Sequence, residues 1–214
     1  MSEKRYGFVI DTDMCMGCNT CGVVCKMENN VPSGIIWNKV LADNGEQLFS
    51  PSGTYPAKGE TSNLSMGFIT IACQHCEAPA CTEVCPTGAT YKDEETGVVL
   101  QNYEVCIGCL SCMAACPYDV RSLNEQEPKY YMGHATGDSN VPQHLANTVE
   151  KCTMCWHRLE KGLEPECVVG CPAKARYFGD FNDPESEVSQ LIATRSYKQL
   201  LPEAGTDPSV YYLV

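Results

Sequence analysis

The cysteine pattern limits what this chain can fold into more than any other feature of the sequence. All sixteen cysteines of the 214 residues fall into four groups of four, and none lies outside a group. Groups one and three have the spacing C-x2-C-x2-C-x3-C, whereas groups two and four lengthen the second gap to four and eleven residues. The groups are Cys15, Cys18, Cys21 and Cys25; Cys73, Cys76, Cys81 and Cys85; Cys106, Cys109, Cys112 and Cys116; and Cys152, Cys155, Cys167 and Cys171.

Disulfides, zinc sites and iron–sulfur clusters are the three kinds of site that crowded cysteines can form. Disulfides need an oxidising compartment, and the N-terminal residues lack the basic and apolar segments of a secretory signal. Structural zinc uses two C-x2-C pairs around one tetrahedral site, which only group four resembles by itself. No C-x2-C pair is followed by histidine, which excludes c-type haem attachment. The spacing of groups one and three is the cluster-binding run of bacterial ferredoxins, so we expect iron–sulfur clusters.

An internal repeat relates the groups to one another. The stretch "DMCMGCNTCGVVC" (13–25) matches "EVCIGCLSCMAAC" (104–116), and "CPTGATY" (85–91) matches "CPAKARY" (171–177). The segment between groups two and three is strand-like at both ends with an acidic turn, which predicts a β-hairpin. Motif, hairpin and motif together predict a two-cluster ferredoxin module. The two outer groups predict a second module, formed by the two ends of the chain around the first.

The repeat also predicts which cysteines share a cluster. In two-cluster ferredoxins the fourth cysteine of each run binds the other cluster of the pair. Applying this exchange within each module gives four sets of ligands, called thiol sets 1 to 4 below. Set 1 is Cys15, Cys18, Cys21 and Cys171; set 2 is Cys152, Cys155, Cys167 and Cys25; set 3 is Cys73, Cys76, Cys81 and Cys116; set 4 is Cys106, Cys109, Cys112 and Cys85.

The expected fold class is α+β, with two ferredoxin-like modules, one inserted in the other, and loop-rich insertions. The predicted parts are module A (1–30 plus 150–182), module B (66–124), insertions at 31–65 and 125–149, and a C-terminal helix and extended tail at 183–214. Strands are predicted in "GIIWNKVLA" (34–42), with Trp37 buried, and in "GFITIA" (67–72); "ESEVSQLIAT" (185–194) predicts the helix. The apolar end of the tail can pack on its own domain or on another chain.

Charge and composition exclude several classes of function. The formal net charge is −12, which argues against binding to nucleic acid. No apolar run approaches the roughly 18 residues of a membrane-spanning helix. We find no phosphate loop, dinucleotide fingerprint or nucleophile–base motif, so no catalytic residue is assigned.

A few residues beside the ligands carry further expectations. Gly17 and Gly108 should allow the backbone to approach the clusters. Lys26, Lys151 and Lys174 can offset cluster charge, although a surface position is the simpler expectation for each. The four histidines are expected to form hydrogen bonds or to lie at the surface, because sixteen thiolates already complete four sites.

The chain resembles the four-cluster iron–sulfur subunits of the dimethyl sulfoxide reductase family. The resemblance is carried by the order of the four groups, the wide fourth group "CTMCWHRLEKGLEPECVVGCP", and the flanks "YGFVIDTDMCMGC" and "ACQHCEAPACTEVCPTGA". It implies four [4Fe–4S] clusters in an electron-transfer subunit, bound to a large molybdopterin-containing catalytic subunit of the respiratory reductase or dehydroxylase type. Set 1 would then face the catalytic subunit, and set 2 an external donor or acceptor, such as a membrane anchor or a soluble carrier.

The resemblance also implies either of two locations, because such subunits can be exported together with a signal-bearing catalytic partner. The protein would then lie in the cytoplasm or, by co-export, in the periplasm. Two other interpretations remain at this point: a free polyferredoxin that shuttles electrons between enzymes, and a zinc-binding scaffold.

Metal analysis separates the cluster interpretation from the zinc interpretation. We expect anaerobically purified protein to be brown and to contain about sixteen iron atoms per chain, with matching inorganic sulfide, since each cube holds four irons. Removing the iron should unfold most of the chain, because ligation is coupled to folding in small metal-rich domains. Colourless, zinc-containing protein would contradict this expectation.

Overall fold

The computed structural model of the protein describes residues 3–42 and 66–214. Part of the predicted insertion at 31–65, namely residues 43–65, lies outside the described residues, as do residues 1–2 of module A. The content is α+β, as expected, with short helices and four small sheets in the described part. No helix within these residues is both long and apolar enough to cross a bilayer.

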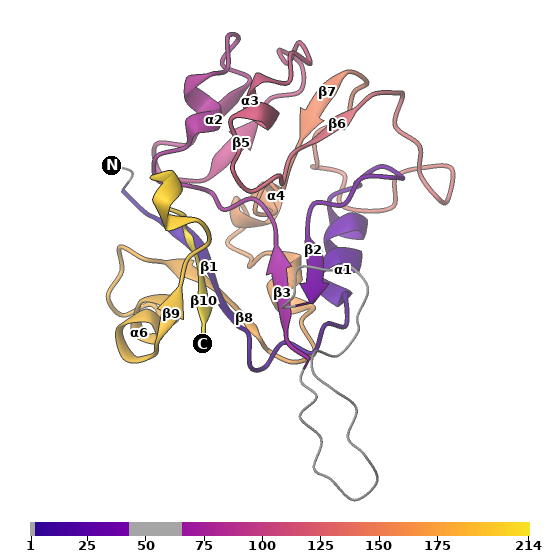
Figure 1. The fold of residues 1–214 in the computed structure, drawn as a ribbon. Helices are drawn as coiled ribbons and strands as arrows, with labels where there is room; N and C mark the ends of the chain where they lie inside the picture. Colours follow the sequence, from indigo (N-terminus) through magenta and orange to yellow (C-terminus); the bar gives the residue numbers. More distant parts are fainter. Residues whose placement is uncertain (1–2, 43–65) are drawn as a thin grey trace, which may run out of the picture.

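The largest sheet joins the two ends of the chain (Figure 1). Its strands are given in their spatial order: β8 (Arg176–Asp180), β1 (Tyr6–Asp11), β10 (Val210–Leu213) and β9 (Tyr197–Lys198). β1 pairs antiparallel with β8 and parallel with β10. The apolar tail therefore packs on its own domain, which decides between the two alternatives left by the sequence.

The alternation of side chains along β1 and β10 divides the core into two parts. Phe8 and Tyr212 point to one face, where they pack with Cys21 and Cys167 in the main apolar cluster. The next residues along the strands, among them Val9, point to the opposite face and pack against α6 (Glu187–Thr194). One face of the sheet thus supports the cysteines, and the other face is covered by the predicted C-terminal helix.

Three two-stranded sheets surround the cysteine groups. They are β2 (Lys39–Ala42) with β3 (Phe68–Ile71), β4 (Thr90–Lys92) with β5 (Val99–Gln101), and β6 (Ser122–Asn124) with β7 (Thr148–Glu150). The β4–β5 pair is the hairpin predicted between groups two and three. The strand predicted at 34–42 is shorter than expected, because the Lys26 ammonium donates to the carbonyls of Pro32 and Ile35 and holds that segment in a turn. Trp37 is buried, as predicted.

Short helices carry or follow the later cysteines of each group. They are α1 (Thr20–Glu28), α2 (Ala80–Glu83), α3 (Ser111–Ala114), α4 (Trp156–Leu159) and α5 (Glu166–Val169), with the 3-10 turn η1 (Pro202–Ala204) near the C-terminus. α1 packs against α5, and α2 packs against α3. Each contact therefore joins helices from two different cysteine groups.

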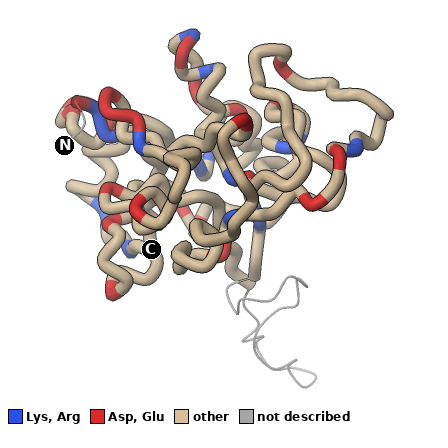
Figure 2. The backbone as a smooth tube through the Cα atoms, turned by 90° about the horizontal axis from the view of Figure 1, so that it is seen from above, with Lys and Arg blue, Asp and Glu red and all other residues tan. Residues whose placement is uncertain are grey.

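Acidic residues are spread over loops on several sides of the molecule (Figure 2). The basic residues are fewer, and some of them lie in the interior of the trace. This distribution fits a solvated acidic surface better than a single acidic face.

The end of β10 offers a matched test of the parallel pairing with β1. The side chain of Leu213 is fully buried, whereas the adjacent Val214 is 53% exposed. We expect Leu213→Ala to reduce the free energy of unfolding by about 2–4 kcal/mol, through lost burial and the cavity left behind. Val214→Ala should change it by no more than about 0.5 kcal/mol. Anaerobic thermal unfolding of both variants measures the difference, and equal losses would contradict the buried tail.

Candidate cluster-binding site

All sixteen cysteines are free thiols, and seven of them are buried. The loops before the helices turn through left-handed backbone conformations, such as those at Gly17 and Gly108. Each tight loop is followed by a short helix, so that the first cysteines of a group lie on the loop, and the later ones lie on the helix or one or two residues after it. This local geometry brings thiols from different groups to shared positions.

One small cavity is lined by Cys15, Cys18, Cys21 and Cys171, the four cysteines of set 1. Three of them come from the N-terminal part of the chain and one from near β8. Their burial is graded, since Cys21 is buried and Cys18 is exposed. The guanidinium-bearing side chain of Arg176 lines the same cavity.

A second small cavity is lined by the four cysteines of set 3, which are Cys73, Cys76, Cys81 and Cys116. Arg121 lines this cavity, as Arg176 lines the first. Burial, followed by the nearby charge of Cys73, raises the pKa of Cys76 to about 12. A thiol with this pKa is protonated at neutral pH unless a metal binds it, and binding therefore releases the proton.

The four thiols of set 2 lie together in the interior. Burial raises the pKa of Cys25 well above its usual value, and the neighbouring thiols Cys152, Cys155 and Cys167 raise it further. The side-chain amide of Asn29 donates to Sγ of Cys155 at 3.3 Å. Burial and the charge of Cys167 raise the pKa of Cys155 to about 12.

The thiols of set 4 also lie close to one another. The charge of Cys85 tends to raise the pKa of Cys109, and the charge of Cys106 raises the pKa of Cys112. Cys109 is exposed, and the Ser111 hydroxyl lies 3.5 Å from its Sγ. Hydrogen bonds from Ser111 lower the pKa of the Cys109 thiol.

Thr20, at the matching position of the repeat, lies 3.3 Å from Sγ of Cys18. Its hydrogen bonds lower the pKa of Cys18, as those of Ser111 do for the thiol in set 4. A hydroxyl thus stabilises the exposed thiolate in set 1 and in set 4. The spacing of the cysteines did not predict this role.

The sets follow one another in a row, because each consecutive pair has neighbouring thiols. The charge of Cys167 raises the pKa of Cys21, so sets 1 and 2 are neighbours. The charge of Cys73 raises the pKa of Cys152, so sets 2 and 3 are neighbours. The charge of Cys81 raises the pKa of Cys112, so sets 3 and 4 are neighbours.

The two outer sets each have an exposed thiol, whereas Cys152, Cys155 and Cys167 of set 2 are buried. The expectation that set 2 faces an external donor or acceptor is therefore wrong for this chain.

The residues present fit an anionic iron–sulfide group. Nε of Arg176 and Nη2 of Arg121 are buried and have no hydrogen-bond partner among the described residues. Both side chains line thiol-lined cavities. An unpaired cationic nitrogen beside four thiols suits a negatively charged ligand, and four thiolates are the ligands that a [4Fe–4S] cube requires.

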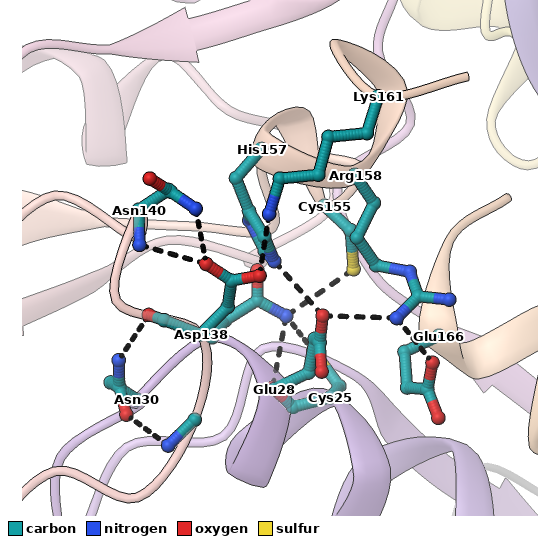
Figure 3. A network of polar contacts seen from close by, with 12 residues as sticks. Cys25, Glu28, Asn30, Asp138, Asn140, Cys155, His157, Arg158, Lys161 and Glu166 are labelled. Carbon is teal, nitrogen blue, oxygen red and sulfur yellow. Dashed lines mark hydrogen bonds and ion pairs between the residues drawn. The ribbon is translucent and has the colours of Figure 1, made fainter. Parts of the chain in front are cut away.

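A polar network lies beside the thiols of set 2 (Figure 3). The carboxylate of Glu28 accepts hydrogen bonds from Nε2 of His157 at 3.0 Å and from Nη1 of Arg158 at 3.1 Å. Asp138 pairs with Lys161 at 2.7 Å. Although ligand atoms of Glu28, Asp138 and His157 lie within 4.8 Å of one another, both carboxylates are already paired with cations. The network therefore fastens α1 to α4 and does not resemble a metal site.

The remaining histidines form hydrogen bonds or lie at the surface, as expected. His75 accepts from the N–H of Val99, and His144 contacts a carboxylate oxygen of Glu150 at 2.7 Å. His134 is exposed.

Lys151 corrects one expectation, since its side chain is fully buried and not at the surface. Lys26 is half-buried and Lys174 is exposed. Arg121 and Arg176 were not singled out from the sequence. The matching segments "CPTGATY" and "CPAKARY" differ at the position of Arg176, where the first repeat has Thr90, and this difference is the one available signal.

Comparison with known proteins gives consistent matches over nearly the whole chain. The 4Fe-4S dicluster domain family matches residues 64–132 and 139–181. A Halobacterium salinarum chain named as a dimethyl sulfoxide reductase iron–sulfur subunit is 50% identical over 98% of this chain and 79% of its own length. The arsenate respiratory reductase iron–sulfur subunit of a Shewanella species is 40% identical over 98% of this chain and 96% of its own. A sulfite dehydrogenase subunit of Allochromatium vinosum is 40% identical over 98% of this chain and 82% of its own.

The close approach at Gly108 can be tested against Gly88, a glycine with a similar backbone conformation. A Cβ at Gly108 would lie 2.4 Å from the backbone oxygen of Asn147, whereas a Cβ at Gly88 meets nothing within 4 Å. Both residues have positive φ. We expect Gly88→Ala to cost about 1–2 kcal/mol for the left-handed conformation alone. Gly108→Ala should cost about 1–3 kcal/mol more, since a backbone oxygen cannot rotate away. Iron content and unfolding midpoint measure the difference, and equal effects would contradict the close approach.

Proposed function

Because the chain belongs to the family of 4Fe–4S dicluster iron–sulfur subunits of reductases, we propose that it relays single electrons between a molybdopterin-containing catalytic subunit and an external donor or acceptor. The chain is an electron-transfer subunit and not a catalytic one. It carries [4Fe–4S] clusters, and its sixteen cysteines supply ligands for four of them. The observation that carries the proposal is the continuous row of four thiol sets, which is exposed at both ends.

The proposal includes the nested arrangement of two ferredoxin-like modules. Module A would consist of residues 1–30 and 150–182, and module B of residues 66–124. Two matching sets of contacts support this arrangement. In module A, β1 pairs with β8 and α1 packs on α5. In module B, β5 pairs with β4 and α3 packs on α2. In both cases a strand and a helix of a regularly spaced group meet a strand and a helix of a lengthened group.

Within these modules, we propose that thiol sets 1 to 4 each hold one cluster. When bound, each cluster takes up and gives back one electron, so the row supplies a path for single electrons across the protein. The chain's own residues hold this row in place and exclude water from its middle, since the thiols of set 2 are buried. Backbone N–H groups of Thr90 and Ala175 donate to Sγ of Cys85 and Cys171, each at 3.4 Å, and so orient the crosswise ligands.

The two exposed ends suit contact with two partners. Met16 and Ile107 occupy matching positions of the repeat, between the first two cysteines of groups one and three. Their side chains are 58% and 65% exposed. Exposed apolar side chains beside an exposed thiol are what a docked partner would cover. The catalytic subunit would bind at one end, and the membrane anchor or soluble carrier at the other.

A free polyferredoxin is the second candidate, and the two exposed ends are compatible with it. The relatives favour the subunit, since the matched proteins are named as subunits. The compartment would follow that of the catalytic partner, in the cytoplasm or, by co-export, outside it.

Anaerobic purification of the tagged chain from its host tests the proposal. We expect a large second chain in fixed ratio, with molybdenum, and electrons that leave the dithionite-reduced clusters when the oxidant of that second chain is added. Elution of the 23.5 kDa chain alone, without molybdenum, would favour the shuttle.

Charged substitutions at the two ends add a control to this experiment. We expect Met16→Asp or Ile107→Asp to weaken capture of one partner about tenfold, or about 1.4 kcal/mol. Leu201→Asp places the same charge at another exposed apolar position and should leave capture unchanged. Equal effects at all three positions would argue against docking at the ends.

A further inference from the structure

Within residues 3–42 and 66–214, three Lys and Arg side chains are buried: Arg121, Lys151 and Arg176, with exposed fractions of 4%, 0% and 6%. None of the three forms an ion pair with a carboxylate in the described part of the chain. A buried charge without a partner of opposite sign is strongly destabilising. Negative charge from neighbouring thiolates and clusters would balance these side chains in their charged form.

Arg176 lies at the junction of sets 1 and 2. It is the first residue of β8, lines the cavity of set 1, and donates from Nη1 to Oγ1 of Thr70 at 2.6 Å. Burial disfavours the charged guanidinium, but the thiolate charges of Cys167 and Cys21 outweigh it and raise the pKa of Arg176. One of these thiols belongs to each set.

Lys151 lies at the junction of sets 2 and 3. Its ammonium donates to the carbonyl oxygens of Val99 and Cys152, the second at 2.9 Å. Burial lowers the pKa of Lys151, and the thiolates of Cys73, Cys152 and Cys81 oppose this shift. These thiols again belong to the two neighbouring sets.

Arg121 lies at the junction of sets 3 and 4. It lines the cavity of set 3 and donates from Nη1 to Thr90 and Gln101, each at 3.2 Å. Burial again disfavours its charge, and the thiolates of Cys81, Cys73 and Cys112 outweigh this and raise the pKa. Every junction in the row thus contains one buried cation, and each buried cation lies at a junction.

We propose that Arg176, Lys151 and Arg121 are positioning charges that set the reduction potentials of the clusters in pairs, one cation for each neighbouring pair. The proposal rests on the ligand sets of the proposed function. Reduction adds a negative charge to a cluster, and a buried cation stabilises this charge with little screening by water. Because one cation stabilises the reduced form of both neighbours, an electron that moves between them stays beside the same positive charge.

The chain needs such cations because its charge is strongly negative. The formal net charge is −12 before any cluster binds. An oxidised cube with four thiolates carries about −2, so the loaded protein approaches about −20. Surface cations are screened by solvent, whereas the three buried cations lie among the thiolates and act on them directly.

Removing each charge in turn gives a pattern that only a row of shared cations produces. The variants are Arg176→Gln, Lys151→Gln and Arg121→Gln, measured in the loaded protein by redox titration with paramagnetic resonance. In each variant we expect two of the four clusters to be at least tenfold harder to reduce, a downward shift of about 59 mV for a one-electron couple. Arg176→Gln and Lys151→Gln should share one shifted cluster, and so should Lys151→Gln and Arg121→Gln. Arg176→Gln and Arg121→Gln should share none.

Matched controls separate charge from packing. Lys174→Gln removes the same charge from an exposed lysine three positions after Cys171 and should leave all four potentials in place. Arg176→Lys and Arg121→Lys keep the charge and should keep the potentials. If a Gln variant fails to load its clusters while the Lys variant loads them, the charge requirement is supported. Failure of both variants at a position would overturn it, as would unshifted potentials or an equal shift of all four clusters.

Iron content separates this inference from the proposed function. A wild-type chain with fewer than four cubes would refute the ligand sets themselves. Four cubes whose reduction potentials stay unchanged in the three Gln variants would refute the inference alone.

Discussion

In the proposed arrangement, ligation of cluster iron by cysteines from distant parts of the chain is the interaction on which the rest of this structure depends. The strands and helices that carry the thiols are short, and α2, α3, α4 and α5 have four residues each. Helices of this length are not stable by themselves. In sets 1 and 2, four thiolates bound to one cube would join segments that lie more than a hundred residues apart, as with Cys21 and Cys171. Thiols account for part of the main apolar cluster, so the ligands and the core are built from the same residues.

The same ligation creates the main electrostatic demand on the fold. Thiolates and clusters place negative charge in the interior of a chain that is already acidic. Hydroxyls lie beside the exposed thiols of the two outer sets, and buried cations lie at the junctions between sets, where they can offset this charge. Exposed thiolates are stabilised by water and by Thr20 or Ser111, whereas in the proposed arrangement buried thiolates depend on Arg121, Lys151 and Arg176. The burial of each thiol, rather than its set, therefore determines which kind of residue lies beside it.

Much of this could be predicted from the sequence, because cluster ligation is partly local. The spacing of cysteines within a group, the hairpin between groups two and three and the helix at 185–194 all depend on neighbouring residues. The repeat added the expectation of nested modules and crosswise ligands. The burial of Lys151 could not be predicted, since one of its acceptors is the carbonyl of Val99, on a strand from another part of the chain. The parallel pairing of β10 with β1 was open for the same reason, because its apolar pattern suits either its own sheet or another chain.

The crosswise sharing of ligands is the central claim, and iron-edge anomalous diffraction from crystals of the anaerobically loaded protein tests it most directly. The account predicts four cubes in a row, with Cys171 bonded to the same cube as Cys15, Cys18 and Cys21, and Cys25 bonded to the next. A map in which Cys15 and Cys25 bind one cube would contradict it.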